Sequence, residues 1–193
     1  MDAALIIGID LQTDHQVAGF FLKRQNWGGT QLITVSDQPN GLCPYCAVSL
    51  QLNPGGYLDF VNGFLYARNI HMQINQKYYE KKLAAILENT DMDANRLQKA
   101  ARLLADAVHP VIVIGGDFAT EDNYEALLQL VLFAQGEGIP ILIIKGKANS
   151  LAAAQLHYKV EPDSKTIETA LIALGDETPN DVLVERCKGI PSL

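Results

Sequence analysis

The sequence predicts an α/β fold: a doubly wound, mostly parallel, Rossmann-like sheet of about six strands with helices on both faces. Short apolar runs that end in glycine or aspartate recur along the chain, and amphipathic segments lie between them. Parallel strands are buried on both faces of their sheet and therefore read as continuous apolar runs. The alternation of such runs with helical segments indicates crossover connections between parallel strands.

The same patterns place the individual elements along the chain. The apolar runs predict strands at residues 3–10, 31–35, 48–52, 111–114, 140–144 and 170–176. Apolar periodicity predicts helices at residues 13–27, 58–68, 77–87, 94–107, 123–135, 148–156 and 181–188. Gly28 and Gly29 supply the positive φ of a helix C-cap, and Asp91 to Asp93 suit the start of the helix that follows them.

Composition bounds the class of protein. The chain has 193 residues, of which 48% are hydrophobic and 19% charged, and this predicts a folded core rather than disorder. We expect a single domain over residues 1–193, while a break near Thr90 leaves open two lobes, 1–90 and 91–193. The first strand begins close to Met1, which fits a piece of a longer polypeptide as well as a complete one.

Charge and hydropathy exclude several partners. The net charge of −7 without a basic stripe argues against nucleic-acid binding. No apolar run approaches the roughly 20 residues that span a bilayer, and no secretory signal is recognisable, so we expect a cytoplasmic protein without direct membrane insertion.

The cysteines offer one candidate for redox chemistry. The segment Cys43-Pro44-Tyr45-Cys46 is similar to a glutaredoxin-type tetrapeptide, in which the first thiol starts a helix. Here the residues after Cys46 alternate like a strand and run into Pro54, which leaves no room for that helix. The third cysteine, Cys187, is remote, and no second C-x-x-C completes a zinc site. Two incidental loop thiols are therefore the favoured interpretation.

No self-contained catalytic centre is recognisable. The four histidines form no H-x-x-x-H pair, and the serines form no G-x-S-x-G elbow. The chain also has neither a G-x-G-x-x-G motif nor a Walker motif. His15 is the notable histidine, because it follows the first predicted strand, and ligands of such sheets lie at the carboxyl ends of the strands.

The order of several weak motifs resembles the molybdopterin oxidoreductases, the family of formate dehydrogenase and of the large iron–sulfur subunit of respiratory complex I. In that family a hydrophobic-Gly-x-Asn turn leading to His-Pro precedes a strand ending Val-Asp-Pro-Arg and a segment ending Arg-Pro-Gly-Thr-Asp. The corresponding segments here are 6–16, 33–38 and 52–57. Residues 100–115, 147–150 and 171–176 are similar to later family segments, so the resemblance covers most of the chain.

The resemblance implies a domain that holds molybdopterin guanine dinucleotide, or a degenerate domain of an oxidoreductase in which this chain holds no cofactor. It also implies partners: other domains or subunits of an iron–sulfur oxidoreductase complex. In the family these turns hold the guanosine and pyrophosphate ends of the cofactor. The residues that the resemblance assigns to this cradle are Gly8, Asp10, His15, Asp37, Gly55, Gly56, Gly115, Asn149 and Ser150.

The departures from the family pattern point to the degenerate form. Asp10 replaces the expected Asn, Gln16 replaces Pro, and Tyr57 replaces the base-binding Asp. A carboxylate at residue 10 is unfavourable beside a phosphate. Two alternatives remain open: the central domain of a thiamine-diphosphate enzyme, which residues 94–145 resemble, and a non-catalytic interaction domain.

Overall fold

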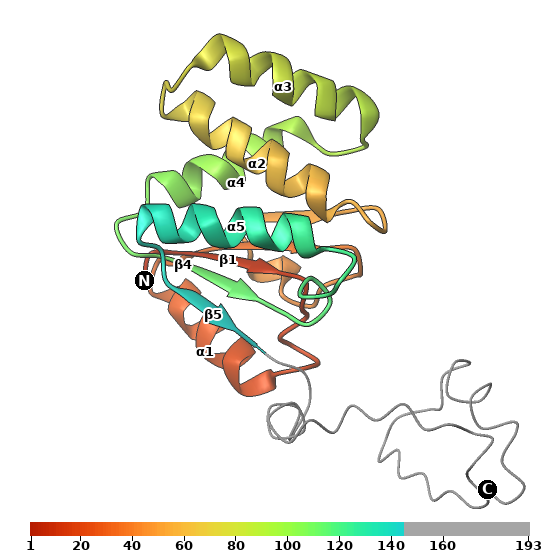
Figure 1. Ribbon diagram of the computed structural model, residues 1–193. Coiled ribbons are helices and arrows are strands. Elements are labelled where there is room, and N and C mark those ends of the chain that lie inside the picture. Colours follow the sequence, from red (N-terminus) through yellow and green to blue (C-terminus); the bar gives the residue numbers. More distant parts are fainter. Residues whose placement is uncertain (145–193) are drawn as a thin grey trace, which may run out of the picture. The chain divides into compact units, whose positions relative to one another are not determined.

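A five-stranded parallel sheet forms the centre of the protein in a computed structural model, which describes residues 1–144 (Figure 1). The strand order is β3-β2-β1-β4-β5, and every neighbouring pair is parallel. The strands are β1 (Ala3–Ile7), β2 (Gln31–Ser36), β3 (Val48–Gln51), β4 (Pro110–Ile114) and β5 (Ile141–Ile143). The predicted fold class, a Rossmann-like α/β sheet, is confirmed.

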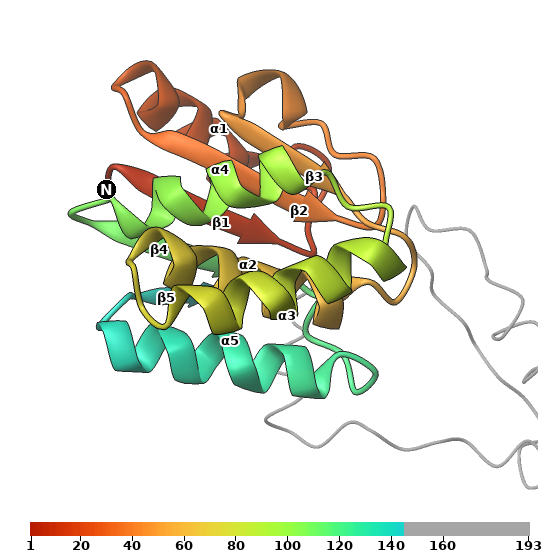
Figure 2. The ribbon, with the colours of Figure 1, turned by 90° about the horizontal axis from the view of Figure 1, so that it is seen from above.

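Helices lie on both faces of this sheet. One face carries α1 (Gln16–Trp27); the other carries α2 (Tyr57–His71), α4 (Ala94–Ala105) and α5 (Tyr124–Glu137) (Figures 1 and 2). Helix α3 (Gln76–Asn89) packs against α2 and forms an outer layer. The expected sixth strand, 170–176, and the expected helices 148–156 and 181–188 lie outside the described residues.

The described residues 1–144 belong to one compact unit of the chain. Within this unit, α2 packs against α4 across the sequence break near Thr90. The prediction of a single domain over residues 1–193 stays a prediction.

Local sequence explains where the helices begin and end. The Asp93 side chain accepts hydrogen bonds from the backbone N–H groups of Asn95 and Arg96, so it caps α4 as the sequence predicts. Helix α1 ends before Gly28, and the positive φ lies at Gly29 (+98°). These caps fix the points at which the chain turns back towards the sheet.

Two apolar clusters of unequal size hold the layers together. The larger one lies between the sheet and α2, α4 and α5, and includes Phe60, Phe64, Leu97 and Leu130. The smaller one lies on the α1 face, where its buried members are Ile6, Ile9, Leu11, Leu42 and Val113. The α1 face therefore contributes much less buried apolar surface to the stability of the fold.

Helix α1 presents most of its large apolar side chains to solvent, whereas Ala18 and Leu22 pack against the smaller cluster. Val17, Phe20, Phe21 and Trp27 are 72%, 59%, 56% and 79% exposed. Gly19 is the buried residue of this helix, and a Cβ there would lie 2.5 Å from the carbonyl oxygen of Leu11. An apolar stripe on a surface helix normally faces the core, so this orientation needs an explanation.

The connection between β2 and β3 has no α-helix. It contains a short 3-10 turn, η1 (Cys43–Tyr45), where a doubly wound fold would often place a crossover helix. Strand β3 is an edge of the sheet, and α4 covers that edge with two cations. Lys99 Nζ donates to the carbonyl oxygen of Ala47 (2.9 Å), and Arg96 Nη1 donates to that of Ser49 (3.2 Å).

Candidate functional site

The carboxyl ends of β1 and β4 form the topological switch point of the sheet. The chain proceeds from β1 outwards to β2 on one side and from β4 outwards to β5 on the other. Ligands of open α/β sheets bind in the crevice at this point. Of the predicted site residues, Gly8 and Gly115 directly follow these two strands, and Asp37 follows the neighbouring strand β2.

At the switch point, the loops that follow β1 and β4 pack directly against each other. Gly8 has a φ of +64°, and a Cβ on it would lie 2.4 Å from Cβ of Phe118. A Cβ on Gly115 would lie 2.2 Å from Cβ of Ile9. Phe118 is fully buried and Ile9 nearly so. The two glycines are therefore required by the packing of the β1 and β4 loops against each other.

Three backbone donors of the crevice are already engaged. The N–H of Gly8 donates to the carbonyl oxygen of Val35 (2.9 Å), and that of Gly115 donates to Ile7 (2.9 Å). The N–H of Asp117 donates to the carbonyl oxygen of Gly8 (3.1 Å). A phosphate at a strand end is normally held by such N–H groups, and these three are not available for it.

The Asp10 side chain connects two loops by hydrogen bonds. Its Oδ1 accepts from the N–H of Gln12 (3.0 Å), and its Oδ2 accepts from the N–H of Gly41 (3.1 Å). Asn40 adds a third hydrogen bond between the two loops, because its Nδ2 donates to the carbonyl oxygen of Ile9 (2.8 Å). His15 is the half-buried N-cap residue of α1 and makes no side-chain capping bond. The carboxylate of Asp10 thus ties the β1–α1 loop to the β2–β3 connection.

Asp37 is bound by a buried tyrosine. The hydroxyl of Tyr57 donates to Oδ1 of Asp37 (3.0 Å), and the Tyr57 ring packs on Phe118 with 5.2 Å between the ring centroids. Burial raises the pKa of the Tyr57 hydroxyl, and the charge of Asp37 adds to that rise. The hydroxyl therefore stays protonated and serves as a donor. Tyr57 occupies the sequence position at which the resemblance places a base-binding Asp.

Two carboxylates lie near Asp117. Burial raises the pKa of Asp117, and the charges of Asp14 and Asp37 raise it further. Asp14 and Asp37, which follow β1 and β2, are therefore each within electrostatic reach of Asp117, which follows β4. Such a rim repels a phosphate.

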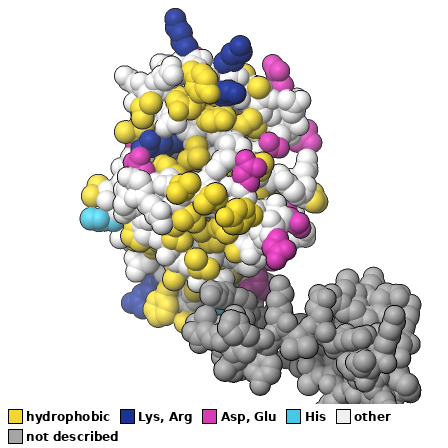
Figure 3. All heavy atoms as spheres, viewed as in Figure 1, with side chains coloured by type: hydrophobic (Ala, Val, Ile, Leu, Met, Phe, Trp, Pro, Cys, Tyr) yellow, Lys and Arg dark blue, Asp and Glu magenta, His cyan; other side chains and the backbone are white. Residues whose placement is uncertain are grey.

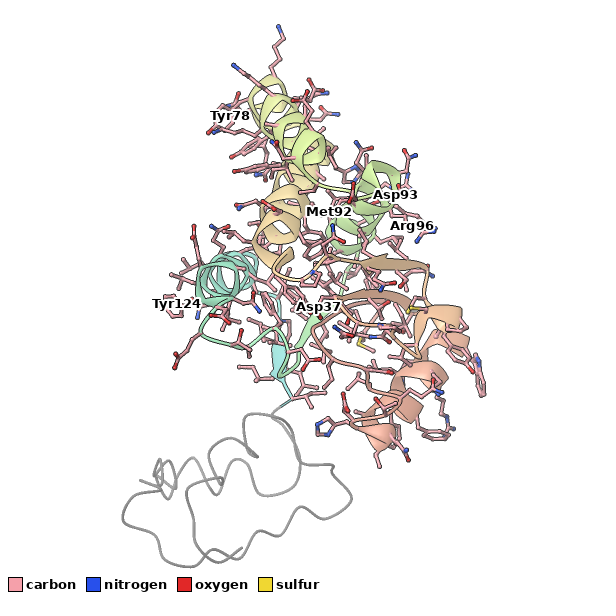
Figure 4. The ribbon with its side chains drawn as sticks, turned by 90° about the vertical axis from the view of Figure 1, so that its right-hand side faces the viewer. Asp37, Tyr78, Met92, Asp93, Arg96 and Tyr124 are labelled. Atoms are coloured by element: carbon pink, nitrogen blue, oxygen red, sulfur yellow. The ribbon has the colours of Figure 1, made fainter. Side chains whose placement is uncertain are left out.

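Gly55 and Gly56 line a pocket at the start of α2. The pocket has a volume of about 230 Å³ and includes Asp59 and Asp91 in its lining. Met92 belongs to the same lining, and Figure 4 shows Met92 near the start of α4 and away from Asp37. Asp59 stands in the first turn of α2, where a carboxylate already interacts with the positive end of the helix dipole.

The cysteine segment does not have the geometry of a thiol oxidoreductase. Its helical part is the three-residue turn η1, and β3 follows, as the sequence predicts. Cys43 is exposed, and its Sγ lies 2.9 Å from Oγ of Ser49. Burial raises the pKa of the Cys46 thiol to about 11, which the neighbouring Thr34 hydroxyl only partly offsets. Cys46 is thus an unreactive thiol at neutral pH.

Part of the predicted site cannot be placed, and part of the observed one was not predicted. Asn149 and Ser150 lie outside the described residues. Sequence reasoning missed Phe118 and Ile9, which close the crevice, because an apolar residue next to a glycine turn gives no signal of its own.

Among residues 1–144, no group of three or more His, Cys, Asp and Glu side chains is arranged to hold a metal ion.

Comparisons with known proteins add little beyond the fold class. No family model matches the chain. No curated protein matches it either. Among solved structures, acetylene hydratase from Pelobacter acetylenicus aligns with a TM-score of 0.47 and 20% identity, over 57% of this chain and 18% of that one. The chain thus corresponds to less than a fifth of that protein, and a likeness at this level carries no argument about function.

The helices of the described part of the chain are all too short or too polar to cross a membrane.

The described residues form a Rossmann-like α/β fold, and at its switch point the β1 and β4 loops pack against each other.

Proposed function

We propose that this chain is a structural domain of a larger oxidoreductase, of the molybdopterin oxidoreductase type, in which the dinucleotide cradle is closed. The observation that carries the proposal is the contact between the β1 and β4 loops, with Phe118 buried against Gly8. The link to this family rests on the order of the sequence motifs and the resulting sheet.

The residues at the switch point do not fit the pyrophosphate of such a cofactor. A phosphate next to Gly8 would meet Phe118 instead of free space. It would also find the local N–H groups bonded to Val35 and Ile7, and a rim of carboxylates that raise the pKa of Asp117. Steric exclusion, the engagement of these donors and charge all act in the same direction.

Calorimetric titration of the full chain with GDP and GMP, and with ADP and AMP as controls, tests this proposal. We expect no binding heat for any of them, and a cooperative unfolding transition that shows the protein to be folded. Selective binding of GDP with a Kd below about 10 μM, weakened in Asp37→Ala, would overturn the proposal. Titration with thiamine diphosphate tests the alternative that residues 94–145 belong to a thiamine-diphosphate enzyme.

The exposed apolar helix faces favour a role in assembly. On the α1 face, Phe20, Phe21 and Trp27 are more than half exposed. On the other side of the sheet, apolar side chains gather over α5 (Figure 3), where Leu132 is 57% exposed. Tyr124, at the start of α5, points away from the body of the domain (Figure 4). We propose other domains or subunits of an iron–sulfur oxidoreductase complex as the partners, in a cytoplasmic location.

The α1 face can be tested without its partner. Replacing Phe20 and Phe21 by serine removes two aromatic rings that contact each other, with 5.8 Å between their centroids. We expect the double variant to bind less of a hydrophobic dye such as ANS and to unfold at nearly the same denaturant concentration, because exposed side chains contribute within about 0.5 kcal/mol. Unchanged dye binding together with a large loss of stability would show that α1 is a core helix.

A further inference from the structure

The outer face of α1 consists of residue types that are typical of protein–protein interfaces. The residues at three- or four-residue intervals along this side of the helix are Val17, Phe20, Phe21, Arg24 and Trp27, and all five are exposed. Tryptophan and arginine are over-represented among the residues that carry most of the binding energy of an interface. Contiguous exposed apolar surface also marks interaction sites. This face therefore has the composition of a contact surface for another protein.

The inner side of α1 holds this face towards solvent. Ala18 and Leu22 pack against the smaller apolar cluster, and a Cβ on Gly19 would lie 2.5 Å from the carbonyl oxygen of Leu11. A helix rotated to bury its aromatic rings would lose this packing. The rings are thus presented before any partner arrives, and a preorganised surface binds with less loss of conformational entropy.

Opposite charges lie at the two ends of α1. Asp14 is exposed and lies two residues before the helix begins, within electrostatic reach of the Asp117 carboxylate. The helix itself contains Lys23 and Arg24 and no Asp or Glu. Lys23 is turned towards the Tyr45 ring, with 5.1 Å from Nζ to the ring centroid. Neither Asp14 nor Arg24 takes part in the ion pairs among residues 1–144, so both charges are left for another molecule.

A face with one acidic and one basic end is complementary to itself. In a two-fold symmetric dimer, each residue i that contacts residue j is matched by a contact of j with i. If two α1 helices pack antiparallel about Phe20 and Phe21, the acidic end of each lies beside the basic end of the other. With a rise of 1.5 Å per residue, Arg24 of one copy lies about 5 Å along the axis from Asp14 of the partner subunit, which an arginine side chain can span.

We propose that α1 is a dimerisation surface and that its occupant is a second copy of this chain. Phe20 and Phe21 pack on the same rings of the second copy at the two-fold axis. At each end, Arg24 pairs with Asp14 of the partner subunit. Dimerisation through α1 does not depend on the function proposed above, because neither a nucleotide nor another protein takes part in it.

The size of the face indicates a weak, reversible dimer. Each of Phe20, Phe21 and Trp27 is more than half exposed. Because a buried aromatic side chain covers about 150–250 Å², these three rings present roughly 300–500 Å² per copy. Two copies then bury about 600–1,000 Å² of aromatic surface, whereas stable interfaces bury about 1,200–2,000 Å² in total. We therefore expect a Kd of about 10–100 μM.

The test is sedimentation velocity of the full chain between about 1 and 500 μM, together with the fluorescence of Trp27. Trp27 is the one tryptophan of the chain, so it reports on this face alone. We expect the average mass to rise towards twice that of the monomer, and the emission of Trp27 to shift to shorter wavelength as its ring leaves water. A chain that stays monomeric up to about 500 μM would overturn the proposal.

Quenching by acrylamide then identifies what replaces the second copy in a monomeric chain. A Trp27 that is open to acrylamide would leave the face to a different protein. A shielded Trp27 would mean that another part of the same chain covers α1. Either result contradicts dimerisation.

Aromatic variants test whether α1 is the surface that associates. Phe20→Ser combined with Phe21→Ser should weaken dimerisation at least tenfold. Leu132→Ser is the matched control, because Leu132 is 57% exposed on α5, and it should leave dimerisation unchanged. Far-UV circular dichroism checks that these variants, altered at exposed positions, are folded. A dimer that survives the aromatic change, or one that is lost in Leu132→Ser, would place the interface elsewhere and overturn the proposal.

Charge reversal tests the antiparallel arrangement. Arg24→Asp and Asp14→Arg each place like charges next to one another at both ends of the helix pair. We expect each single variant to weaken dimerisation about fivefold or more. The variant that combines Asp14→Arg with Arg24→Asp restores opposite charges, and its Kd should return to within about twofold of the original. If the combined variant is as weak as the single ones, Asp14 and Arg24 do not pair across the axis and the arrangement is wrong.

Discussion

The switch-point crevice and a pocket beside β2 and β3 lie next to neighbouring strands of one sheet, yet they are built in opposite ways. At the crevice, Ile9 and Phe118 pack against the two glycine turns, and Asp117 adds a carboxylate beside them. The pocket beside β2 and β3 has a volume of about 250 Å³, and Arg96 is the one charged residue in its lining. The comparison teaches that a fold class indicates where ligands tend to bind, whereas the packing of individual loops decides whether the place is open.

Phe118→Ala is the strongest test of the closed crevice. Phe118 is fully buried and contacts the Tyr57 ring, so truncation should lower the free energy of unfolding by about 3–5 kcal/mol. Urea unfolding measures the loss, and Phe20→Ala is the control because that ring is 59% exposed. If both variants lost equally little stability, the crevice would be loosely packed and able to admit a ligand.

Two glycine variants test why the turns at Gly8 and Gly55 contain glycine. Gly8→Ala introduces a Cβ that lies 2.4 Å from Phe118, on a backbone with a φ of +64°. Gly55→Ala places its Cβ in open space, at a φ of +80°. We expect Gly55→Ala to cost about 1–2 kcal/mol for the left-handed backbone, and Gly8→Ala to cost a further ~1–3 kcal/mol for crowding.

The difference between the two glycine variants, measured by urea unfolding, is the informative quantity. Equal losses would show that the Gly8 turn is kept for its backbone conformation alone. In that case the space above Gly8 would be available to a phosphate after all.

Asp117→Asn tests the acidic rim and should have the smallest effect. The pKa of Asp117 is raised in the folded state, so between the unfolded and folded pKa values the folded protein binds more protons than the unfolded chain. The free energy of unfolding therefore falls as the pH rises through that window. At neutral pH the full penalty is present, and asparagine removes it.

The expected gain from Asp117→Asn is below about 1 kcal/mol, because the side chain is largely exposed to solvent screening. It should be present at pH 7 and disappear below the unfolded pKa, near pH 3. Chemical unfolding at both values, with Glu121→Gln from the same loop as a control, measures it. A gain that is equal at pH 3 would trace to hydrogen bonding rather than charge.

Elements of the fold follow from local sequence, whereas the state of the site does not. The apolar runs predict β1 and β4, and Asp93 marks the start of α4, because burial and capping are local properties. Gly8 and Gly115 are correctly placed at strand ends, but the sequence offers a phosphate as their reason, whereas the structure offers Ile9 and Phe118. That distinction depends on contacts between segments about 110 residues apart, which no local pattern encodes.

Helix α1 illustrates the same limit from another direction. Its apolar periodicity predicts a helix, and the helix is present from Gln16 to Trp27. Periodicity alone would turn Phe20 towards the sheet, yet the residue that approaches Leu11 is Gly19. The close approach of α1 to Leu11 therefore requires Gly19 on the side of the helix that faces the sheet.

The two cations that α4 places over the edge of β3 have a consequence for the behaviour of the protein at high concentration. A strand from another molecule could pair with β3 only by displacing Lys99 from Ala47 and Arg96 from Ser49. Exposed edges are templates for sheet extension and aggregation, and charged side chains on them are a common protection. The two cations therefore protect the protein against strand-by-strand polymerisation on this side of the sheet.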